Sequence, residues 1–407
     1  MRQALEAANN TGFANTGIFP RIPGKTAGIG RTAFLSARNR VSSSPMRTIS
    51  PLLLRAALLS AVCLVHPVAA PAQPGPDYQV FVSNERSGDL TVINGADLSV
   101  AATIPVGKRP RGIHASPDGK TIYVALSGTP ISAPPQLDAQ GNPIFQKGGD
   151  DDDDDAKADK AADGIGVVDA ARRKFLRKIP AGSDPENFAV SADGARLFIS
   201  NEDAGAASIV NIASEKIEHL ALVSREPEGV AVTPDGGAFY VTCETAGDIF
   251  VIDSKTGREI TRFSVHPRPR SADFLPGGAR AFIPSESAGE MNVVDAIHHK
   301  LLRTVALPKG SRPMCVKAAP DGRKVYVSAG RAGTICVLDA ETAEVLNTIK
   351  VGARPWGIAI SPDGRRLYAA NGPSDDVSVV DLVAEKEIAR VKSPGSPWGV
   401  VIVPRAR

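Results

Sequence analysis

Residues 354–381 read RPWGIAISPDGRRLYAANGPSDDVSVVD, and they are the clearest copy of a unit that recurs through most of the chain. Two short apolar runs within this stretch, 356–361 and 366–370, are joined by Pro362-Asp363-Gly364. Because proline presets φ and glycine accepts a positive φ, this tripeptide predicts a hairpin turn between two strands. A third run, 377–381, alternates valine with polar residues and predicts another strand.

The glycine of this turn recurs at a nearly constant interval. It occurs at Gly119, Gly194, Gly236, Gly278, Gly322 and Gly364, with spacings of 75, 42, 42, 44 and 42 residues. A period near 42 residues with about four short strands per copy is typical of β-propeller blades. The strand before the turn and the strand after it each occur seven times. The sequence therefore predicts an all-β fold, a seven-bladed β-propeller of four-stranded antiparallel blades.

The two sets of strands are out of phase, since the array begins with the second strand of a unit and ends with the first. A ring of blades must cover the edges of its first and last sheets, and one blade built from both ends of the chain does so. We therefore expect the N-terminal strands within residues 79–106 to pair with a C-terminal strand at residues 398–403.

The first 72 residues have a different character. Residues 1–45 are basic and lack strand or helix periodicity, which favours a disordered extension translated from an upstream start codon over a targeting or nucleic-acid-binding arm. Residues 46–72 combine Arg47 and Arg55, an apolar run at 56–65 and the sequence Ala70-Pro71-Ala72, a pattern typical of a secretory signal peptide. The apolar run is too short to span a membrane. We expect cleavage near Ala72, a periplasmic location, and a propeller over residues 73–407.

Charge and cysteine usage exclude some classes of protein. Eight of the 47 Lys and Arg residues, but only one of the 44 acidic residues, lie before residue 73, so the remainder is slightly acidic and does not favour nucleic-acid binding. Cys243, Cys315 and Cys336 match no metal-binding spacing. We expect them to be buried free thiols.

One blade contains an insert, because its turn spacing is 75 residues instead of 42. The insert occupies residues 127–163 and includes six consecutive aspartates, 150–155. A block of like charge without apolar partners predicts disorder, and it lacks the glycine-containing spacing of a calcium loop. We expect the insert to emerge beside Arg111 and Glu85.

Strand direction places two sets of residues on one face of the ring. One set follows the proline that opens each first strand, and the other follows each second strand. The first set is Arg111, Glu186, Glu228, Arg270, Met314, Trp356 and Trp398, and the second is Glu85, Ser127, Glu202, Glu244, Glu286, Gly330 and Gly372. The charged and aromatic members of both sets are the candidate binding residues.

Two interpretations of these sets stay open. Charges on one side and an aromatic shelf on the other suit an extended polar ligand or a protein partner. Alternatively, the charged residues form ordinary salt bridges around a channel mouth, and the tryptophans cover the closing blade. The histidines form no pair at metal-ligand spacing, and there is no nucleophile elbow or phosphate loop. The sequence thus predicts no catalytic residue and no metal ligand.

The repeats resemble a known family. Val82-Ser83-Asn84, Tyr240-Val241-Thr242-Cys243 and Tyr368-Ala369-Ala370-Asn371 resemble YVTN β-propeller repeats, and the series RPRGI, DPENFAV, EPEGVAV, RPRSADF, RPWGIAI and SPWGVVI is similar to the PQQ-dependent catabolism-associated β-propeller subgroup. The resemblance implies an exported protein that accompanies periplasmic oxidation of alcohols. Similar repeats occur in haem d-type propellers and sugar lactonases, although Cys-x-x-Cys-His is absent.

From these features we expect a non-enzymatic periplasmic accessory protein, a monomer that binds a small polar ligand or a periplasmic protein and does not bind nucleic acid. The alternatives are a periplasmic hydrolase resembling lactonases and a propeller that binds a redox cofactor such as haem. The sequence leaves the ligand and the cofactor open.

Overall fold

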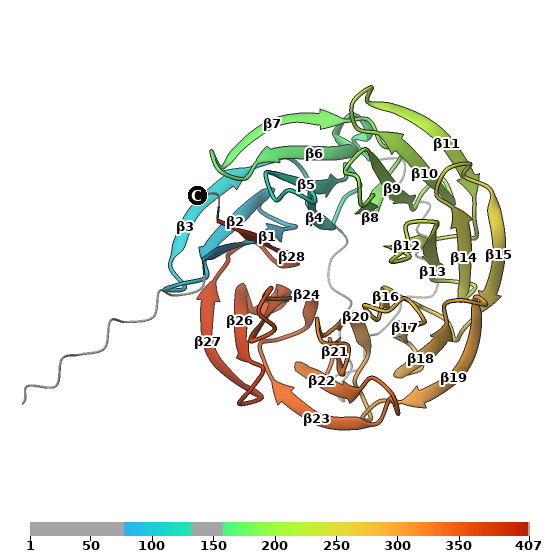
Figure 1. Ribbon diagram of the computed structural model, residues 1–407. Helices are drawn as coiled ribbons and strands as arrows, with labels where there is room; N and C mark the ends of the chain where they lie inside the picture. Colours follow the sequence, from blue (N-terminus) through green and yellow to red (C-terminus); the bar gives the residue numbers. More distant parts are fainter. Residues whose placement is uncertain (1–76, 132–157, 406–407) are drawn as a thin grey trace, which may run out of the picture. The chain divides into compact units, whose positions relative to one another are not determined.

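The computed structural model describes residues 77–131 and 158–405, and the structural statements below refer to these residues. All described residues belong to one compact unit. This unit consists of seven four-stranded antiparallel sheets arranged in a ring (Figure 1). The predicted seven-bladed β-propeller is confirmed.

Each blade contributes one strand to each of four concentric positions (Figure 1). The innermost strands are β4 (Ile113–Ala115), β8 (Pro185–Val190), β12 (Pro227–Val232), β16 (Asp273–Phe274), β20 (Pro313–Ala318), β24 (Pro355–Ile360) and β28 (Pro397–Pro404). The second strands are β5 (Thr121–Leu126), β9 (Arg196–Asn201), β13 (Ala238–Cys243), β17 (Arg280–Ser285), β21 (Lys324–Ala329), β25 (Arg366–Asn371) and β1 (Tyr78–Asn84).

The two outer positions follow the same order around the ring. The third strands are β6 (Gly164–Asp169), β10 (Ala206–Asn211), β14 (Asp248–Asp253), β18 (Glu290–Asp295), β22 (Thr334–Asp339), β26 (Asp376–Asp381) and β2 (Asp89–Asn94). The fourth strands are β7 (Lys174–Ile179), β11 (Lys216–Leu222), β15 (Glu259–Ser264), β19 (Lys300–Ala306), β23 (Val345–Lys350), β27 (Lys386–Lys392) and β3 (Val100–Pro105).

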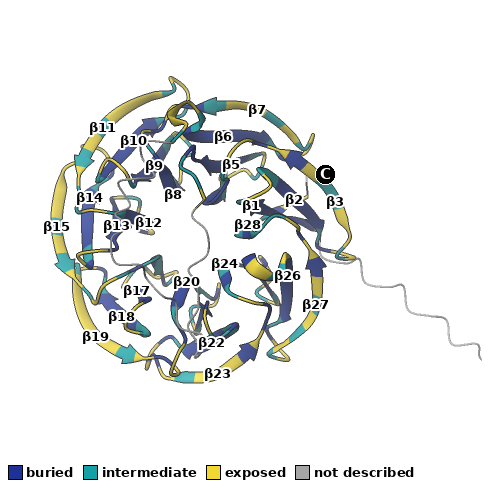
Figure 2. Cartoon of the chain, turned by 180° about the vertical axis from the view of Figure 1, so that it is seen from behind, coloured by how far each residue is buried: buried dark blue, intermediate teal, exposed yellow. Residues whose placement is uncertain are grey.

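The core lies between neighbouring sheets, in the second and third strands. Figure 2 shows these strands as buried and the fourth strands as largely exposed. In β17, for example, Ala281, Phe282 and Ile283 are fully buried, whereas β19 in the same blade leaves Leu301 and Leu302 exposed. Charged residues such as Lys300 accompany these exposed leucines, and charge on an edge strand opposes edge-to-edge pairing with other chains.

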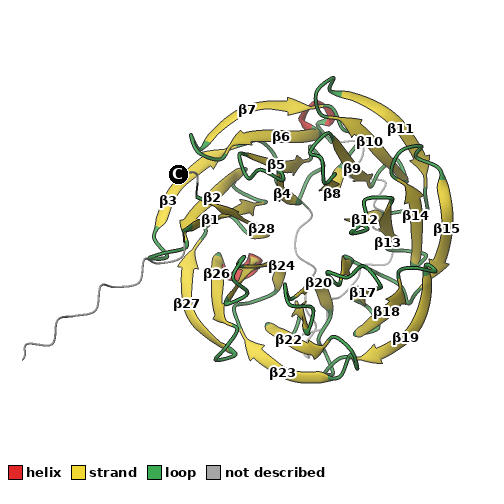
Figure 3. Ribbon diagram, in the orientation of Figure 1, coloured by secondary structure: helices red, strands yellow, loops and turns green. Residues whose placement is uncertain are grey.

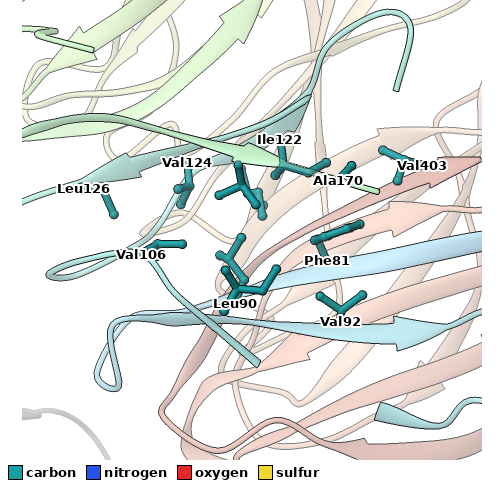
Figure 4. Close-up of a cluster of buried hydrophobic side chains, with 12 residues drawn as sticks. Phe81, Leu90, Val92, Val106, Ile122, Val124, Leu126, Ala170 and Val403 are labelled. Carbon is teal, nitrogen blue, oxygen red and sulfur yellow. The ribbon is translucent and has the colours of Figure 1, made fainter. Parts of the chain in front are cut away.

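The ring closes as the sequence predicted. β28 pairs antiparallel with β1, so that Gln79 lies opposite Val403 and Val82 lies opposite Val400. The closing blade then packs on the next one: Figure 4 shows Phe81 and Leu90 among a buried cluster that includes Ile122, Val124 and Val403.

The two faces of the ring differ in structure. We call the face at which the innermost strands begin the near face and the opposite one the far face. The Asp-Gly hairpin turns lie on the far face, and their glycines are left-handed, for example Gly119 at φ 69° and Gly364 at φ 68°. The described helices are single 3-10 turns, η1 (Lys160–Ala162) and η2 (Gly372–Ser374), shown in red in Figure 3. No helix among the described residues is long and apolar enough to cross a membrane.

Candidate functional site

A cavity of about 330 Å³ opens at the centre of the near face. Its walls come from several blades and are almost entirely charged or aromatic. The lining residues are Glu85, Arg109, Arg111, Glu186, Glu202, Glu226, Glu228, Glu244, Arg268, Arg270, Arg354, Trp356 and Trp398. We call this space the near-face cavity. Its volume is that of a site for a small molecule.

Irregular strand starts direct these side chains into the cavity. The register of five innermost strands shifts just after the opening proline, for example between Pro185 and Phe188 and between Pro227 and Val230. Such a bulge leaves residues without a regular partner and changes where their side chains point. Glu186 and Glu228 lie within these bulges, so the backbone itself presents them to the channel.

A hydroxyl group from the preceding blade then fixes each of three near-face residues. The hydroxyl belongs to a second strand, and it donates to the backbone carbonyl of the residue 28 positions further along the chain. The pairs are Ser83 Oγ to Arg111 O, Ser200 Oγ to Glu228 O and Ser328 Oγ to Trp356 O, each at 2.6 Å. Because these bonds join neighbouring blades, they hold parts of the cavity wall in a constant position.

On one side of the cavity, arginines surround two buried glutamates. Arg270 Nε donates to Glu286 Oε2 at 2.8 Å and its Nη1 contacts Glu244, while Arg268 and Arg312 also pair with Glu286. Burial acts to raise the pKa of Glu286, but the three arginines outweigh it and lower that pKa to about 2. Glu286 is therefore ionised at neutral pH and serves to hold the arginines.

On the opposite side, carboxylates surround one arginine. Asp184, Glu186 and Glu202 have oxygens within 4.8 Å of one another, the spacing of a metal site. Arg111 Nη2 contacts all three carboxylates, with Asp184 at 3.4 Å and Glu202 at 3.6 Å. The guanidinium already supplies the positive charge at this point, so this cluster is an Arg-centred ion network in the structure.

Glu228 differs from the other carboxylates. It is 6% exposed, it lines the near-face cavity, and Arg270 Nη1 lies 3.4 Å from its Oε1. Burial raises the pKa of Glu228, and the charge of Glu202 acts in the same direction against the opposing effect of Arg270. A buried carboxyl with a raised pKa that faces a cavity is typical of a general acid or base.

Arg354 and the two tryptophans form the third part of the wall. The Trp356 and Trp398 rings are stacked, with centroids 6.1 Å apart and planes inclined by 21°, and both side chains are half-buried. Arg354 Cζ lies 4.6 Å from the Trp356 ring centroid, within cation–π distance. Among the described residues, Arg354 is in contact with no carboxylate at ion-pair distance, unlike the other arginines of the cavity.

The structure brings the sequence-predicted candidates together. Nine of them line the near-face cavity: Arg111, Glu186, Glu228, Arg270, Trp356, Trp398, Glu85, Glu202 and Glu244. Glu286 lies behind them as the partner of Arg270, and Met314 lines a smaller adjoining space of about 50 Å³. Cys315 also lines that space and is only partly buried, so the expectation that all three thiols are buried is wrong for Cys315.

Sequence reasoning missed a third ring of residues, those immediately before the opening prolines. All seven adopt a left-handed φ, between 44° and 63°, although the residue before a proline normally avoids helical conformations. They are Arg109, Asp184, Glu226, Arg268, Arg312, Arg354 and Ser396. The sequence did contain a signal for this ring, because a polar or charged residue precedes every opening proline. Strained backbone at non-glycine residues is often found at functional sites.

Three glycines near the tryptophans allow close approach of neighbouring groups. A Cβ at Gly357 would lie 2.7 Å from Trp398 O, and a Cβ at Gly399 would lie 2.6 Å from Arg111 O. The absence of a Cβ at Gly357 lets β24 lie close to β28, and its absence at Gly399 lets β28 lie close to the start of β4. A Cβ at Gly372 would lie 2.9 Å from Trp356 Nε1, so Gly372 makes room for the indole.

Both ends of the acidic insert are ordered. Gly128 N donates to Asp163 Oδ1 at 2.7 Å, and Asp184 N donates to Asp163 Oδ2 at 3.1 Å, which ties the insert to the Arg111 network. Residues 127–131 and 158–163 of the insert are among the described residues, and the expectation of disorder over 127–163 stays a prediction. The aspartate run and the predicted leader at residues 1–72 lie outside the described residues.

Comparisons with known proteins agree with the fold. The family model described as lactonase, 7-bladed beta-propeller, matches residues 225–387. No curated protein sequence matches the chain.

Among solved structures, a putative 6-phosphogluconolactonase from Bacteroides fragilis NCTC 9343 is 17% identical, with a TM-score of 0.63 over 82% of this chain and 100% of that one. The Pseudomonas aeruginosa periplasmic gluconolactonase is 19% identical, with a TM-score of 0.60 over 80% and 99%. Kuenenia stuttgartiensis hydrazine synthase is 17% identical, with a TM-score of 0.61 over 78% and 99%.

These findings overturn the expectation of a non-enzymatic accessory protein, because the matching family model is that of lactonases and it favours the hydrolase alternative. The structural likenesses are too distant in sequence to indicate more than the fold, and the structures concerned have different named functions. The family model covers less than half of the chain. The chain is a seven-bladed β-propeller.

Proposed function

We propose that the protein is a lactonase-like hydrolase that opens a cyclic ester in the near-face cavity, with Glu228 as the general base. The principal support is the position of Glu228, a buried carboxyl with a raised pKa at the wall of a charged cavity. The match of residues 225–387 to the lactonase family model supports the same reaction class and includes Glu228.

The reaction requires a water molecule and a base. Ionised Glu228 takes a proton from water while the water oxygen attacks the ester carbonyl carbon. The tetrahedral intermediate then collapses, the bond between the carbonyl carbon and the ring oxygen breaks, and the ring oxygen receives the proton that Glu228 holds. The product is an open-chain hydroxy acid. The raised pKa of Glu228 makes the carboxylate a stronger base than an ordinary glutamate.

Arginines on the same wall are suited to stabilise the negative charge of the intermediate. Arg270 is 3.4 Å from Glu228 but already shared with Glu244 and Glu286. Arg354 lines the same cavity with its guanidinium against Trp356, and no carboxylate of the described residues lies at ion-pair distance from it. We assign oxyanion stabilisation to Arg354, and binding of the apolar face of the lactone ring to the stacked tryptophans.

The test is a titration of acid release when purified protein is mixed with a set of γ- and δ-lactones. Glu228→Gln keeps the size of the side chain and removes the base, so we expect kcat to fall by about 10²–10⁴-fold with the fold intact. Glu259→Gln, on the exposed outer strand β15 of the same blade, is the matched control and should keep full activity. Equal activity in wild-type protein and Glu228→Gln would show that Glu228 is not the base.

We also propose that the protein is exported with residues 46–72 as its signal peptide and 73–407 as the propeller, after an N-terminal extension at 1–45. The resemblance to YVTN repeats and to the PQQ-associated subgroup supports a periplasmic location. N-terminal sequencing of the secreted protein should begin at Gln73, and material retaining residues 1–40 would refute the proposal.

A further inference from the structure

A second cavity of about 330 Å³ lies toward the far face, and it shares no lining residue with the near-face cavity. Its wall is mostly formed by alanine and valine from the innermost strands, with three polar exceptions. The lining residues are His114, Ala115, Ala189, Val190, Val230, Ala231, Val232, Pro234, Ala272, Asp273, Phe274 and Lys317. We call it the far-face cavity. Nothing in the proposed hydrolysis uses it.

The three polar residues occupy one position of the repeat. The fourth residue after each opening proline is His114, Ala189, Ala231, Asp273, Lys317, Ala359 or Val401. In four blades this position holds alanine or valine, and such small apolar side chains are sufficient to pack the innermost strands around the channel. A histidine and a charged pair on an otherwise apolar wall lose hydration, so packing alone does not explain them.

Lys317 is only loosely paired. Its Nζ lies 3.6 Å from Asp273 Oδ1, while Asp273 Oδ2 accepts a hydrogen bond from Ala318 N at 2.7 Å. The side chain of Lys317 is 36% exposed, at the wall of the cavity. An ammonium group has three donors, and the distant carboxylate uses at most one of them. Lys317 can therefore bind an anionic group inside the cavity.

His114 supplies a hydrogen-bond acceptor. Its Nε2 is 3.2 Å from Asn187 Oδ1, and that oxygen also accepts from Phe188 N, which fixes it as the acceptor. Nε2 is thus the protonated nitrogen and Nδ1 has a free lone pair. Burial lowers the pKa of His114 to about 4, and the charge of Lys317 acts in the same direction, so the ring is neutral at pH 7. The edge of the Phe188 ring further fixes the imidazole.

We propose that the far-face cavity is a second ligand site, which binds a small organic carboxylate through Lys317 and accepts a hydrogen bond from a hydroxyl group of the same ligand at His114 Nδ1. The ligand class follows from the three chemical features of the wall: one ammonium group, one neutral acceptor and an apolar surface of alanine and valine. A short hydroxy acid presents a carboxylate, a donor and a methylene chain to these features. The site is independent of the proposed hydrolysis.

The probe is 4-hydroxybutyrate, titrated into the full-length protein in a calorimeter, with butyrate and 1,4-butanediol as comparisons. Butyrate should bind more weakly because it lacks the donor, and butanediol should not bind because it lacks the carboxylate. Lys317→Met keeps the length of the side chain and should weaken 4-hydroxybutyrate at least about tenfold, the size of one charge-assisted contact. Glu259→Gln, on the exposed strand β15 and outside both cavities, should leave this affinity unchanged.

Asp273→Asn is a second test of the same site, for which we expect tighter binding instead of weaker binding. A gain in affinity does not arise from misfolding, so this variant remains informative if Lys317→Met fails to fold. The amide oxygen can still accept from Ala318 N, but the competing negative charge beside Lys317 is gone, so 4-hydroxybutyrate should bind several-fold more tightly. The proposal is overturned if wild-type protein does not bind 4-hydroxybutyrate, if folded Lys317→Met binds it as well as wild type does, or if Asp273→Asn leaves the affinity unchanged.

Discussion

The near-face and far-face cavities have the same volume and both take residues from β8 and β12, yet their chemistry is opposite. The near-face cavity takes its residues from bulges and from left-handed positions before prolines. The far-face cavity takes its residues from regular strand positions, where most blades have alanine or valine. In this propeller, the densely packed charged residues lie where the backbone is irregular. Bulges and turns can direct several long side chains toward one point.

The largest effect should come from opening the ring, because both cavities depend on its closure. Deleting residues 398–407 removes most of β28 and exposes the edge of β1, including the buried residues around Val403. We expect loss of the cooperative thermal transition of the whole domain, measured by circular dichroism. A truncated protein with an unchanged melting temperature would mean that the blades are stable without closure.

A matched pair of substitutions compares the two cavities directly. Arg270→Met leaves Glu228 without an ion-pair partner among the described residues and removes one of the arginine partners of Glu244 and Glu286. Breaking a buried ion pair in this way costs about 3–5 kcal/mol. Lys317→Met breaks a loose, partly exposed pair and should cost less than about 1 kcal/mol. Urea unfolding of both variants measures the difference, and equal losses would contradict the contrast between the cavities.

Acid should weaken the ion pairs of the near-face cavity, because Glu286 becomes protonated at low pH. The pKa of Glu286 is lowered from 4.5 to about 2, so its ionised form contributes roughly 3 kcal/mol to stability above pH 4.5, and this contribution is lost as the pH falls from 4.5 toward 2. Glu286→Gln lacks the contribution at every pH. The free-energy difference between wild type and Glu286→Gln should therefore shrink over that range, and a constant difference would show that Glu286 has an ordinary pKa.

Truncation of Trp356 should affect substrate binding more than stability, because its half-buried ring stacks on Trp398 at the cavity wall. Trp356→Ala should cost clearly less than the 3–5 kcal/mol of a core aromatic truncation, while weakening substrate binding. In Trp398→Phe, Trp356 is the only indole, and its fluorescence should be accessible to quenchers. A blue emission that resists quenching would identify Trp356 as a core residue.

The sequence was sufficient for the architecture because each blade carries its own local signals. The spacing of the turn glycines predicted seven blades, and the phase offset predicted the pairing of β28 with β1. Strand direction also predicted which side chains share the near face. Contacts between blades were not predictable, since they join residues that no local pattern relates: Glu286 proved to be a partner of Arg270, and Gly372 proved to be the residue that makes room for Trp356.

In the proposed reaction, the lactone is hydrolysed beside Glu228 in the near-face cavity. The most direct measurement is a crystal structure of Glu228→Gln soaked with a lactone that the wild-type enzyme hydrolyses. We expect density for the intact ring against Trp356, with its carbonyl oxygen at Arg354 and its carbonyl carbon facing the substituted residue 228. A ring bound elsewhere on the propeller, with the near-face cavity holding only solvent, would contradict it.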